Sequence, residues 1–509
     1  MRFTVTNEQM KAAEANADNA GISYMRMMRN AGEACFSRIS KILGGVEGKD
    51  IVILAGRGNN GGDGIVIANL LTEARANAIL VFVQDLPKTD CARECYSLYE
   101  RVIKTTLYLH RKETVQYAIA NCDAVIDCVF GTGFHGELEE VVSELFRYTN
   151  ENCPGLRISV DVPSGINSDT GEVAINAFMP DVTLVLAAMK RGLYSHPAYE
   201  YCGRIILTDI GIPQTMYEWF EAVLSDSSLL GLIPERKSVS HKGTYGKLLN
   251  ISGSAYYTGA AMLSTDGALR AGVGLCTLAT PTRVINAIAS AVPETIYLPL
   301  EQDMDGFINS AAVRMVSEEL VRTKYSAVLT GCGLGNNKST ADMTETVIKR
   351  ADCPIIIDAD GLNSIAPNIN ILKESKKGII VTPHPAEFAR MTGLSVEEIQ
   401  QDRLTAAKNF SKEFHCVTVL KGVNTVIVSA DGDTFVNTTG NAGLAKGGSG
   451  DVLAGIIASL CAQGVGMFHA AALGVYLHGL AADVLAGRIG KPGLLPRDLP
   501  AVLPEIMKR

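Results

Sequence analysis

The sequence lacks the features that mark several common classes of protein. Charged residues make up only 20% of its 509 residues, and the net charge is −8. A general nucleic-acid-binding protein carries a basic face, so we expect no nucleic-acid partner. A disordered chain has few apolar residues and a high net charge, whereas 47% of this chain is hydrophobic. These absences leave an ordinary globular protein with a large core.

The sequence also has no long uninterrupted hydrophobic run. Its first eight residues contain no apolar signal core. The most apolar region, residues 452–486, is broken by Gln463, His469, His478 and five glycines. A membrane span needs about 20 predominantly apolar residues, so buried helices explain this region better. We therefore expect no membrane partner and a cytoplasmic location.

Paired cysteines of the kind that hold zinc are absent. The twelve cysteines are scattered singly, and the closest two, Cys91 and Cys95, have no second pair to complete a metal site. Several lie in apolar runs, as Cys128 does. The sequence therefore predicts buried, reduced thiols.

What the sequence does have is a regular alternation of strand and helix patterns. Buried β-branched runs at residues 51–55, 79–83, 124–127, 157–161, 182–187 and 204–208 predict parallel strands, with helices at 8–20, 24–43 and 64–75. The rhythm lapses between residues 212 and 240. It restarts with strands at 247–252, 274–279, 327–330, 354–358, 378–382, 417–421 and 425–429. We predict two α/β domains, residues 1–215 and 236–509, joined by a linker at 216–235.

A glycine-rich segment follows the strand at 51–55. Residues 56–64 contain five glycines together with Asn59, Asn60 and Asp63, and we expect a loop here with a helix starting near Gly64. Glycines allow positive φ and close approach to a ligand, and a helix N-terminus favours an anion. The segment matches neither G-x-G-x-x-G nor the P-loop pattern, so a glycine-rich turn without a ligand remains an alternative.

Two aspartates close neighbouring strands of this half. Asp127 precedes the segment 128–136, and Asp161 precedes Val162-Pro163-Ser164-Gly165. Either could simply cap the next helix. Because the carboxyl ends of parallel strands meet at one edge, we expect these loops and the segment 59–64 to form one pocket.

These segments resemble the NAD(P)HX epimerase family over nearly all of residues 1–215, which implies a Rossmann-like three-layer sandwich that interconverts the R and S hydrates of the cofactor. Asp161 would be the acid/base residue, and Asn60, Asp127 and Ser164 would coordinate K⁺, a hard cation that suits oxygen ligands. The residues that would bind the hydrated cofactor are Asn59, Asn60, Gly61, Gly62, Asp63, Gly131, Thr132, Gly133, Phe134, His135, Gly136 and Glu137.

The second half contains a stronger anion-binding pattern. Gly447-Gly448-Ser449-Gly450-Asp451 leads directly into a long apolar helix. Backbone N–H groups of such a loop form a nest for a phosphoryl group. Asp451 beside it could take a proton from a hydroxyl being phosphorylated, although an aspartate capping a helix is the simpler alternative.

Other polar loops follow the remaining strands of this half. They include His241–Lys247, Gly331–Gly335, Asp358–Asn363, Thr382–Phe388 and Lys421–Thr425. Individually they are weak signals, since Asp358 and Asp360 could be turn formers and His384 could be packed in a rigid turn. Their shared place at strand ends indicates an active site.

This half resembles the ADP/ATP-dependent NAD(P)HX dehydratase, a branch of the ribokinase-like αβα fold. The resemblance implies phosphorylation of the ring hydroxyl by ADP or ATP with Mg²⁺, followed by loss of phosphate. Nucleotide would bind to Lys421, Gly422, Val423, Asn424, Thr425, Gly440, Asn441, Ala442, Gly443, Leu444, Ala445, Lys446, Gly447, Gly448, Ser449 and Gly450. The hydrated cofactor would contact Gly333, His384, Pro385, Ala386, Glu387, Phe388, Ala389, Arg390 and the catalytic Asp451.

The resemblance has one departure and leaves two alternatives. Cys332 stands where the family more often has proline. The chain could instead be a ribokinase-like kinase of a vitamin alcohol with a regulatory N-terminal domain, or its N-terminal domain could be a binding module without activity. The first alternative leaves Asn60, Asp127, Asp161 and Ser164 without a role. Loss of Asp161 or of the glycine-rich segment would have favoured the second, and both are present. The family also implies a homo-oligomer.

Overall fold

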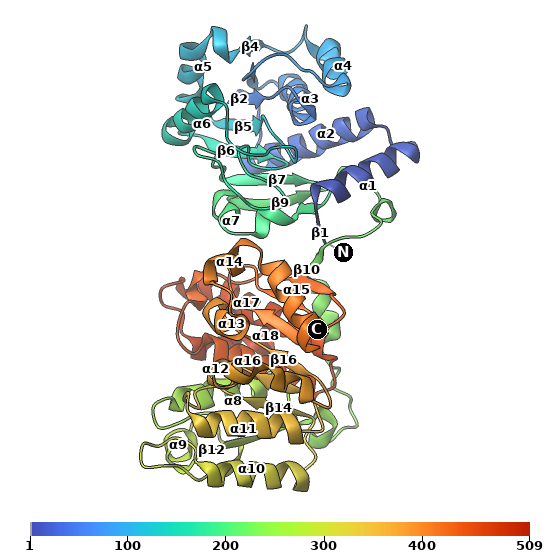
Figure 1. Ribbon diagram of the computed structural model, residues 1–509. Coiled ribbons are helices and arrows are strands. Elements are labelled where there is room, and N and C mark those ends of the chain that lie inside the picture. The colour runs from blue at the N-terminus through green and yellow to red at the C-terminus, as the bar shows by residue number, and fades with distance from the viewer. Residues whose placement is uncertain (1–2, 509) are drawn as a thin grey trace. The chain divides into compact units, whose positions relative to one another are not determined.

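The computed structural model describes residues 3–508, which form two compact units that divide between Ala222 and Val223 (Figure 1). Each unit is a parallel sheet covered by helices, so the predicted α/β fold class is confirmed. All twelve cysteines are free and most are buried, as predicted.

The first unit is built on a seven-stranded sheet in which every neighbouring pair is parallel. Its order is β4 (Thr105–Leu107), β3 (Asn77–Phe82), β2 (Asp50–Ala55), β5 (Ala124–Cys128), β6 (Leu156–Val160), β7 (Val182–Leu186) and β9 (Arg204–Thr208). The chain runs outward from β2 through β3 to β4 and then returns to β5 on the other side of β2. The point between β2 and β5, where the order reverses, is where open α/β sheets bind ligands.

Helices cover both faces of this sheet, so successive side chains of a strand enter different cores. On β2, Ile51 and Ile53 pack with α2 (Tyr24–Leu43) and α3 (Asn59–Glu73), whereas Val52 and Leu54 pack with α5 (Lys112–Ile119) and α6 (Glu140–Asn152). The remaining elements are α1 (Asn7–Asn19), α4 (Asp90–Tyr99), α7 (Ala198–Tyr201) and the parallel pair β1 (Phe3–Val5) and β8 (Met189–Lys190). This double covering explains why apolar residues occupy both alternating faces of β2 from Ile51 to Ala55.

The start of α3 differs from the prediction. The helix begins at Asn59 with Gly58 as its N-cap, five residues before the expected start at Gly64. None of the five glycines in residues 56–64 has a positive φ. They are needed for close packing instead, because a Cβ on Gly61 would lie 2.0 Å from the carbonyl oxygen of Gly56. Polar and glycine residues looked like a loop in the sequence, but they form the first turns of a helix pressed against the strand ends.

The second unit has a longer sheet. Seven strands are parallel in the order β13 (Ile296–Leu300), β12 (Leu275–Pro281), β11 (Lys247–Ile251), β14 (Ala327–Thr330), β15 (Ile355–Ile357), β16 (Ile379–Val381) and β17 (Val417–Leu420). β18 (Val426–Val428) and β19 (Thr434–Val436) continue it as antiparallel strands, and β10 (Ala222–Leu224) pairs in parallel with β19. The order reverses between β11 and β14, which places a second ligand-binding edge there.

Two helical layers cover this sheet. The first contains α8 (Thr258–Arg270), α16 (Ser449–Ala462), α17 (Met467–Ile489) and α18 (Leu499–Ile506). The second contains α10 (Ser310–Arg322), α11 (Lys338–Arg350), α12 (Ala359–Ile365), α13 (Pro385–Thr392), α14 (Val396–Gln401) and α15 (Arg403–Phe414). The short helix α9 (Thr282–Ile288) packs against β12 and β13. Among the described helices, only α17 is long and apolar enough to cross a membrane, and 72% of its apolar window is buried inside the unit. It is a core helix, as the sequence predicted.

The contact between α16 and α8 depends on Gly455. A Cβ at this position would lie 2.0 Å from the carbonyl oxygen of Ser264 in α8. Gly455→Ala should therefore lower the free energy of unfolding by about 2–3 kcal/mol, because backbone must move to make room. The matched control is Gly487→Ala on the exposed side of α17, where nothing lies within 4 Å and the change should stabilise by about 0.5–1 kcal/mol. Urea unfolding measures both, and equal stabilities for the two variants would contradict this packing.

Candidate active sites

The first unit contains a cavity of about 600 Å³ at the carboxyl ends of its strands. Its lining includes Asn59, Asn60 and Asp63 of α3, Gly131, Thr132, Gly133 and Phe134 of the segment after β5, and Asp161 after β6. The structure thus brings together residues from all three predicted loops. Gly61 and Gly62 are buried in the packing of α3, and His135, Gly136 and Glu137 lie farther along the segment, outside the lining.

Asp127 and Ser164 lie beneath this cavity. The carboxylate of Asp127 is fully buried and accepts hydrogen bonds from the hydroxyls of Ser164 (2.7 Å) and Ser159 (2.9 Å) and from the backbone N–H groups of Ser164 and Val129. Burial raises the pKa of Asp127 to about 6, although these hydrogen bonds oppose the rise. The Ser164 hydroxyl also accepts from the N–H of Phe130 at 2.8 Å. The network ties the loops after β5 and β6 together.

Asn60 joins the same loops from α3. Its Nδ2 donates to the carbonyl oxygens of Phe130 (2.8 Å) and Val160 (3.2 Å). Its Oδ1 is buried and has no hydrogen-bond partner among the described residues. A buried amide oxygen without a partner is costly, so this atom is a candidate ligand for a bound group.

Asp161 lies at the cavity wall in a constrained conformation. Its φ is +69°, which is uncommon for a residue other than glycine. Lys190 of β8, buried with a side chain only 2% exposed, donates from Nζ to Asp161 Oδ1 and, at 2.7 Å, to the carbonyl oxygen of Leu186. Sequence reasoning missed Lys190. The available signal was a lysine that directly follows the apolar run Leu184–Met189.

Two further carboxyl groups face this cavity. Burial and the nearby Asp161 charge raise the pKa of Asp63 well above its usual value. The pKa of Glu14 on α1 is also raised, chiefly by burial, and the charge of Lys190 opposes that shift. The cavity therefore concentrates carboxyl groups around one buried lysine.

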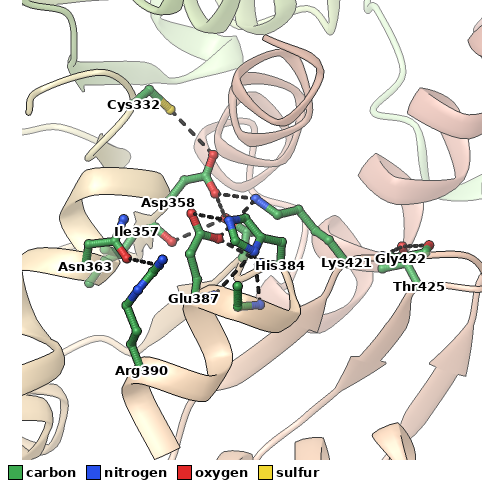
Figure 2. A network of polar contacts seen from close by, with 12 residues as sticks. Cys332, Ile357, Asp358, Asn363, His384, Glu387, Arg390, Lys421, Gly422 and Thr425 are labelled. Carbon is green, nitrogen blue, oxygen red and sulfur yellow. Dashed lines mark hydrogen bonds and ion pairs between the residues drawn. The ribbon is translucent and has the colours of Figure 1, made fainter. Parts of the chain in front are cut away.

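The second unit places a buried charge network at the ends of β14 to β17 (Figure 2). Asp358 follows β15, and its Oδ1 accepts from Lys421 Nζ and from the Thr382 hydroxyl, both at 2.8 Å. Lys421 also lies 3.7 Å from Glu387. Sequence analysis placed Asp358 in a polar loop of the expected active site, with a turn former as the alternative, and the structure shows that its carboxylate pairs with Lys421.

Asp451 lies beside this network on the first turn of α16. Its carboxylate, that of Asp358 and the thiol of Cys332 have ligand atoms within 4.8 Å of one another. Burial, with the Asp358 charge as the next cause, raises the pKa of Asp451 to about 7, and the pKa of the Cys332 thiol lies well above its usual value for the same reasons. A carboxyl with such a pKa can exchange protons at neutral pH.

The residues around His384 form the start of α13. His384 is the N-cap and its Nδ1 accepts from the N–H groups of Ala386 and Glu387. Burial lowers the pKa of His384. Arg390 donates to Asn363 at 2.8 Å, as Figure 2 shows, whereas Phe388 is fully buried in the core. Pro385 and Ala389 also belong to α13. Gly333, which has a φ of +62°, packs against Tyr257.

The predicted nucleotide-binding segments surround the N-terminus of α16. Gly448 is the N-cap of α16 with φ +101°, and nothing lies within 4 Å of a Cβ built on Gly447. Asp483 holds the segment 440–446 by accepting from the N–H of Gly440 and the amide of Asn441, both at 2.8 Å. The ammonium group of Lys446 donates hydrogen bonds to the carbonyl oxygens of Pro492 and Leu494, so it stabilises the fold of this segment.

The remaining residues of the predicted nucleotide-binding segments lie in the loops around the N-terminus of α16 and after β17. Ala442, Gly443 and Leu444 form a 3₁₀ turn that leads to Ala445, Ser449 contacts His478 at 3.2 Å, and Gly450 lies against Lys421 and Asp358. In the segment after β17, Thr425 accepts from the N–H of Gly422, Val423 is 63% exposed, and Asn424 has a positive φ. A glycine-rich N-terminus with accessible backbone N–H groups is an anion-binding arrangement.

The fold and the two sites define a two-domain α/β enzyme whose second domain is ribokinase-like. The family described as NAD(P)H-hydrate dehydratase matches residues 248–505, and the family described as YjeF-related protein N-terminus matches residues 25–192. The chain is 35% identical to the bifunctional NAD(P)H-hydrate repair enzyme Nnr of Moorella thermoacetica, over 95% of this chain and 92% of that protein. It is 32% identical to the Escherichia coli enzyme of the same name, over 96% of this chain and 91% of that protein.

A solved structure resembles the second unit. It is the ADP/ATP-dependent NAD(P)H-hydrate dehydratase of Bacillus subtilis co-crystallised with ATP/Mg²⁺. Its sequence is 36% identical to the matched part of this chain, and the TM-score is 0.50. The match spans 56% of this chain and 97% of the Bacillus subtilis chain. The chain belongs to the family of bifunctional NAD(P)H-hydrate repair enzymes.

Removing one partner of the Asp358–Lys421 pair should destabilise the second unit. Lys421→Met would leave the Asp358 carboxylate, whose side chain is 2% exposed, beside Glu387 and Asp451 without its cation. We expect the free energy of unfolding of the second unit to fall by about 3–5 kcal/mol. Lys349→Met, which removes an exposed pair with Glu345, is the control and should change it by less than about 1 kcal/mol. Chemical denaturation at pH 8 measures both, and a loss no larger than that of the control would contradict the assignment.

Proposed function

We propose that this chain repairs hydrated NADH and NADPH with two activities, an epimerase in the first unit and a dehydratase in the second. The observation that carries the proposal is an acid–base carboxyl group beside a helix N-terminus in each unit, Asp161 near α3 and Asp451 on α16. Matches to both families along one chain support the pairing of activities. They do not favour a vitamin-alcohol kinase, which would leave the first site unused.

In the first unit, Asp161 is the proposed acid/base residue. The cofactor has an anionic pyrophosphate that suits the N-terminus of α3, where Asn59 and Asn60 begin the helix. The hydrated ring would then lie toward Asp161 and the segment Gly131 to Phe134. Interconversion of R and S hydrates requires the proton of the ring hydroxyl to leave as the bond from that carbon to the ring nitrogen breaks, and to return when the ring closes on the other face. A carboxylate at the cavity wall can hold this proton in between.

K⁺ fits the oxygen-rich floor of this cavity. The unpartnered Asn60 Oδ1 supplies one ligand, and the proposed Asp127 and Ser164 lie in the adjoining network. A hard, weakly held cation suits oxygen ligands. Bound there, it would neutralise negative charge under the substrate.

In the second unit, the proposed reaction transfers a phosphoryl group from ADP or ATP to the ring hydroxyl. Asp451 takes the hydroxyl proton as the oxygen attacks phosphorus, and the bond from phosphorus to the nucleotide breaks. The C–O bond then breaks with loss of phosphate and of a neighbouring ring proton, which restores the nicotinamide double bond. The Gly447–Gly450 backbone holds the phosphates, and Mg²⁺ would be bound mostly by these phosphates and water. A homo-oligomeric state and a cytoplasmic location complete the proposal.

Absorbance at 340 nm tests the two activities together. The wild-type protein with mixed R and S NADHX, ADP and Mg²⁺ should recover all of the NADH. Asp161→Asn should recover only the S half rapidly, and Asp451→Asn should lower the dehydration rate by about 10²–10⁴-fold. No recovery by the wild-type protein with ADP or ATP would contradict the dehydratase proposal, and full rapid recovery by Asp161→Asn would contradict the role of Asp161.

The pH dependence of dehydration should follow Asp451. Its base form is needed and its pKa lies at about 7. With S-NADHX as substrate, kcat/KM should therefore rise about tenfold per pH unit below pH 7 and level off above it. Asp161→Asn should show the same profile, because that residue lies in the other unit. A profile that is flat between pH 5 and 8 would exclude Asp451 as the base.

A further inference from the structure

Lys190 is the buried cation of the first site. It ends the two-residue strand β8, it lines the cavity, and its side chain is 2% exposed. Two of its three N–H donors have partners, namely Asp161 Oδ1 and the carbonyl oxygen of Leu186. Burying an ammonium group costs several kcal/mol unless it is paired, so the fold holds this charge beside Asp161 at an energetic cost.

The contacts of Lys190 leave Asp161 with one occupied and one available oxygen. Oδ1 is bonded to Lys190 and lies 3.4 Å from the N–H of Leu186. Oδ2 faces the cavity-lining segment after β5, because a Cβ built on Gly131 would lie 3.2 Å from it. The lysine therefore selects which oxygen of Asp161 can meet a substrate.

Titratable groups of three helices surround the pair of Asp161 and Lys190. Glu14 of α1 and Asp63 of α3 are the carboxyl groups that interact with it, and Cys35 of α2 is the nearby thiol. Burial and like charges both favour the neutral form of a carboxyl group, and an adjacent cation favours the ionised form. Lys11, also on α1, opposes the charge of Glu14.

We propose that Lys190 is a positioning residue of the epimerase site, which holds Oδ1 of Asp161 and directs its Oδ2 toward the hydrated ring. This inference rests on the proposed epimerase function. Asp161 takes the proton of the ring hydroxyl on Oδ2 as the bond between that carbon and the ring nitrogen breaks, which leaves an open-chain aldehyde and places the electron pair on the nitrogen. After the aldehyde rotates, the nitrogen adds to its other face, the oxygen takes the proton back from Asp161, and the ring closes with the opposite configuration. Lys190 keeps its own proton throughout, so no proton is gained or lost. A structural pair that only holds β8 in place would not need an available oxygen facing the cavity.

The test measures interconversion of purified R and S NADHX by chromatography, without nucleotide, between pH 5.5 and 9.5. In the pH profile of kcat, the acid limb (the fall in kcat on the acidic side) should shift to a pH at least one unit higher in Lys190→Met. The reason is that the lost cation makes the Asp161 carboxyl easier to protonate. Activity should fall at least tenfold at pH 7 and recover partly at pH 9. Lys190→Arg, which keeps the charge, should retain the wild-type acid limb. Thermal unfolding of the same full-length variants, followed by circular dichroism, checks that the first unit is folded, because dehydration of S-NADHX reports only on the second unit.

A double variant separates positioning from a general structural role. If Lys190 acts through Asp161, Lys190→Met added to Asp161→Asn should lower the rate by less than twofold beyond Asp161→Asn alone. This double variant also has no unpaired buried charge, so it should fold even if Lys190→Met does not, and Lys190→Gln serves as the second neutral variant.

Three outcomes distinguish a failure of the proposed role of Lys190 from a failure of the proposed epimerase activity. A uniform loss of activity with an unmoved acid limb, or additive losses in the double variant, would overturn the role of Lys190. Wild-type protein that does not interconvert the epimers would instead overturn the proposed epimerase.

Discussion

A buried carboxylate paired with a buried ammonium group lies at the centre of each site, and the polar residues around it depend on that pairing. In the first unit the pair is Asp161 and Lys190, and in the second it is Asp358 and Lys421. Neither pair adds much net stability, because desolvation opposes the attraction. Removing either partner, however, leaves a charge that the apolar surroundings cannot accommodate. The pairs therefore constrain the loops that carry the reacting groups.

The sheet topology explains why both pairs form where they do. In each unit the strand order reverses once, between β2 and β5 or between β11 and β14, and loops from several parallel strands meet near that point. A helix begins there with a glycine N-cap, Gly58 for α3 and Gly448 for α16. The helix N-terminus favours an anion, and the carboxyl groups beside it acquire raised pKa values through burial. In each unit a helix N-terminus and a carboxyl group with a raised pKa thus lie at the same edge of the sheet.

Much of this arrangement could be predicted from the sequence, because parallel strands covered on both faces are continuously apolar. Residues 51–55 and 124–127 were recognisable for that reason, and the polar residues after them marked the site. The start of α3 could not be predicted correctly, since Gly61 and Gly64 are there for close packing and look like loop residues in sequence. Lys190 was missed because its partner is 29 residues away and only the fold brings them together. Asp358 was recognised as part of a polar loop, but its pairing with Lys421 could not be predicted because the two residues are 63 positions apart in the sequence.

The central claim is that two sites on one chain act in sequence on the same hydrated cofactor. The most direct measurement follows R-NADHX, S-NADHX and NADH separately by chromatography after pure R-NADHX is added to the wild-type protein. Without nucleotide, the account predicts that R converts to an R/S mixture and that no NADH forms. Addition of ADP and Mg²⁺ should then convert both hydrates to NADH with one phosphate released per NADH. NADH formed without nucleotide, or R-NADHX that persists while S-NADHX is consumed, would contradict the account.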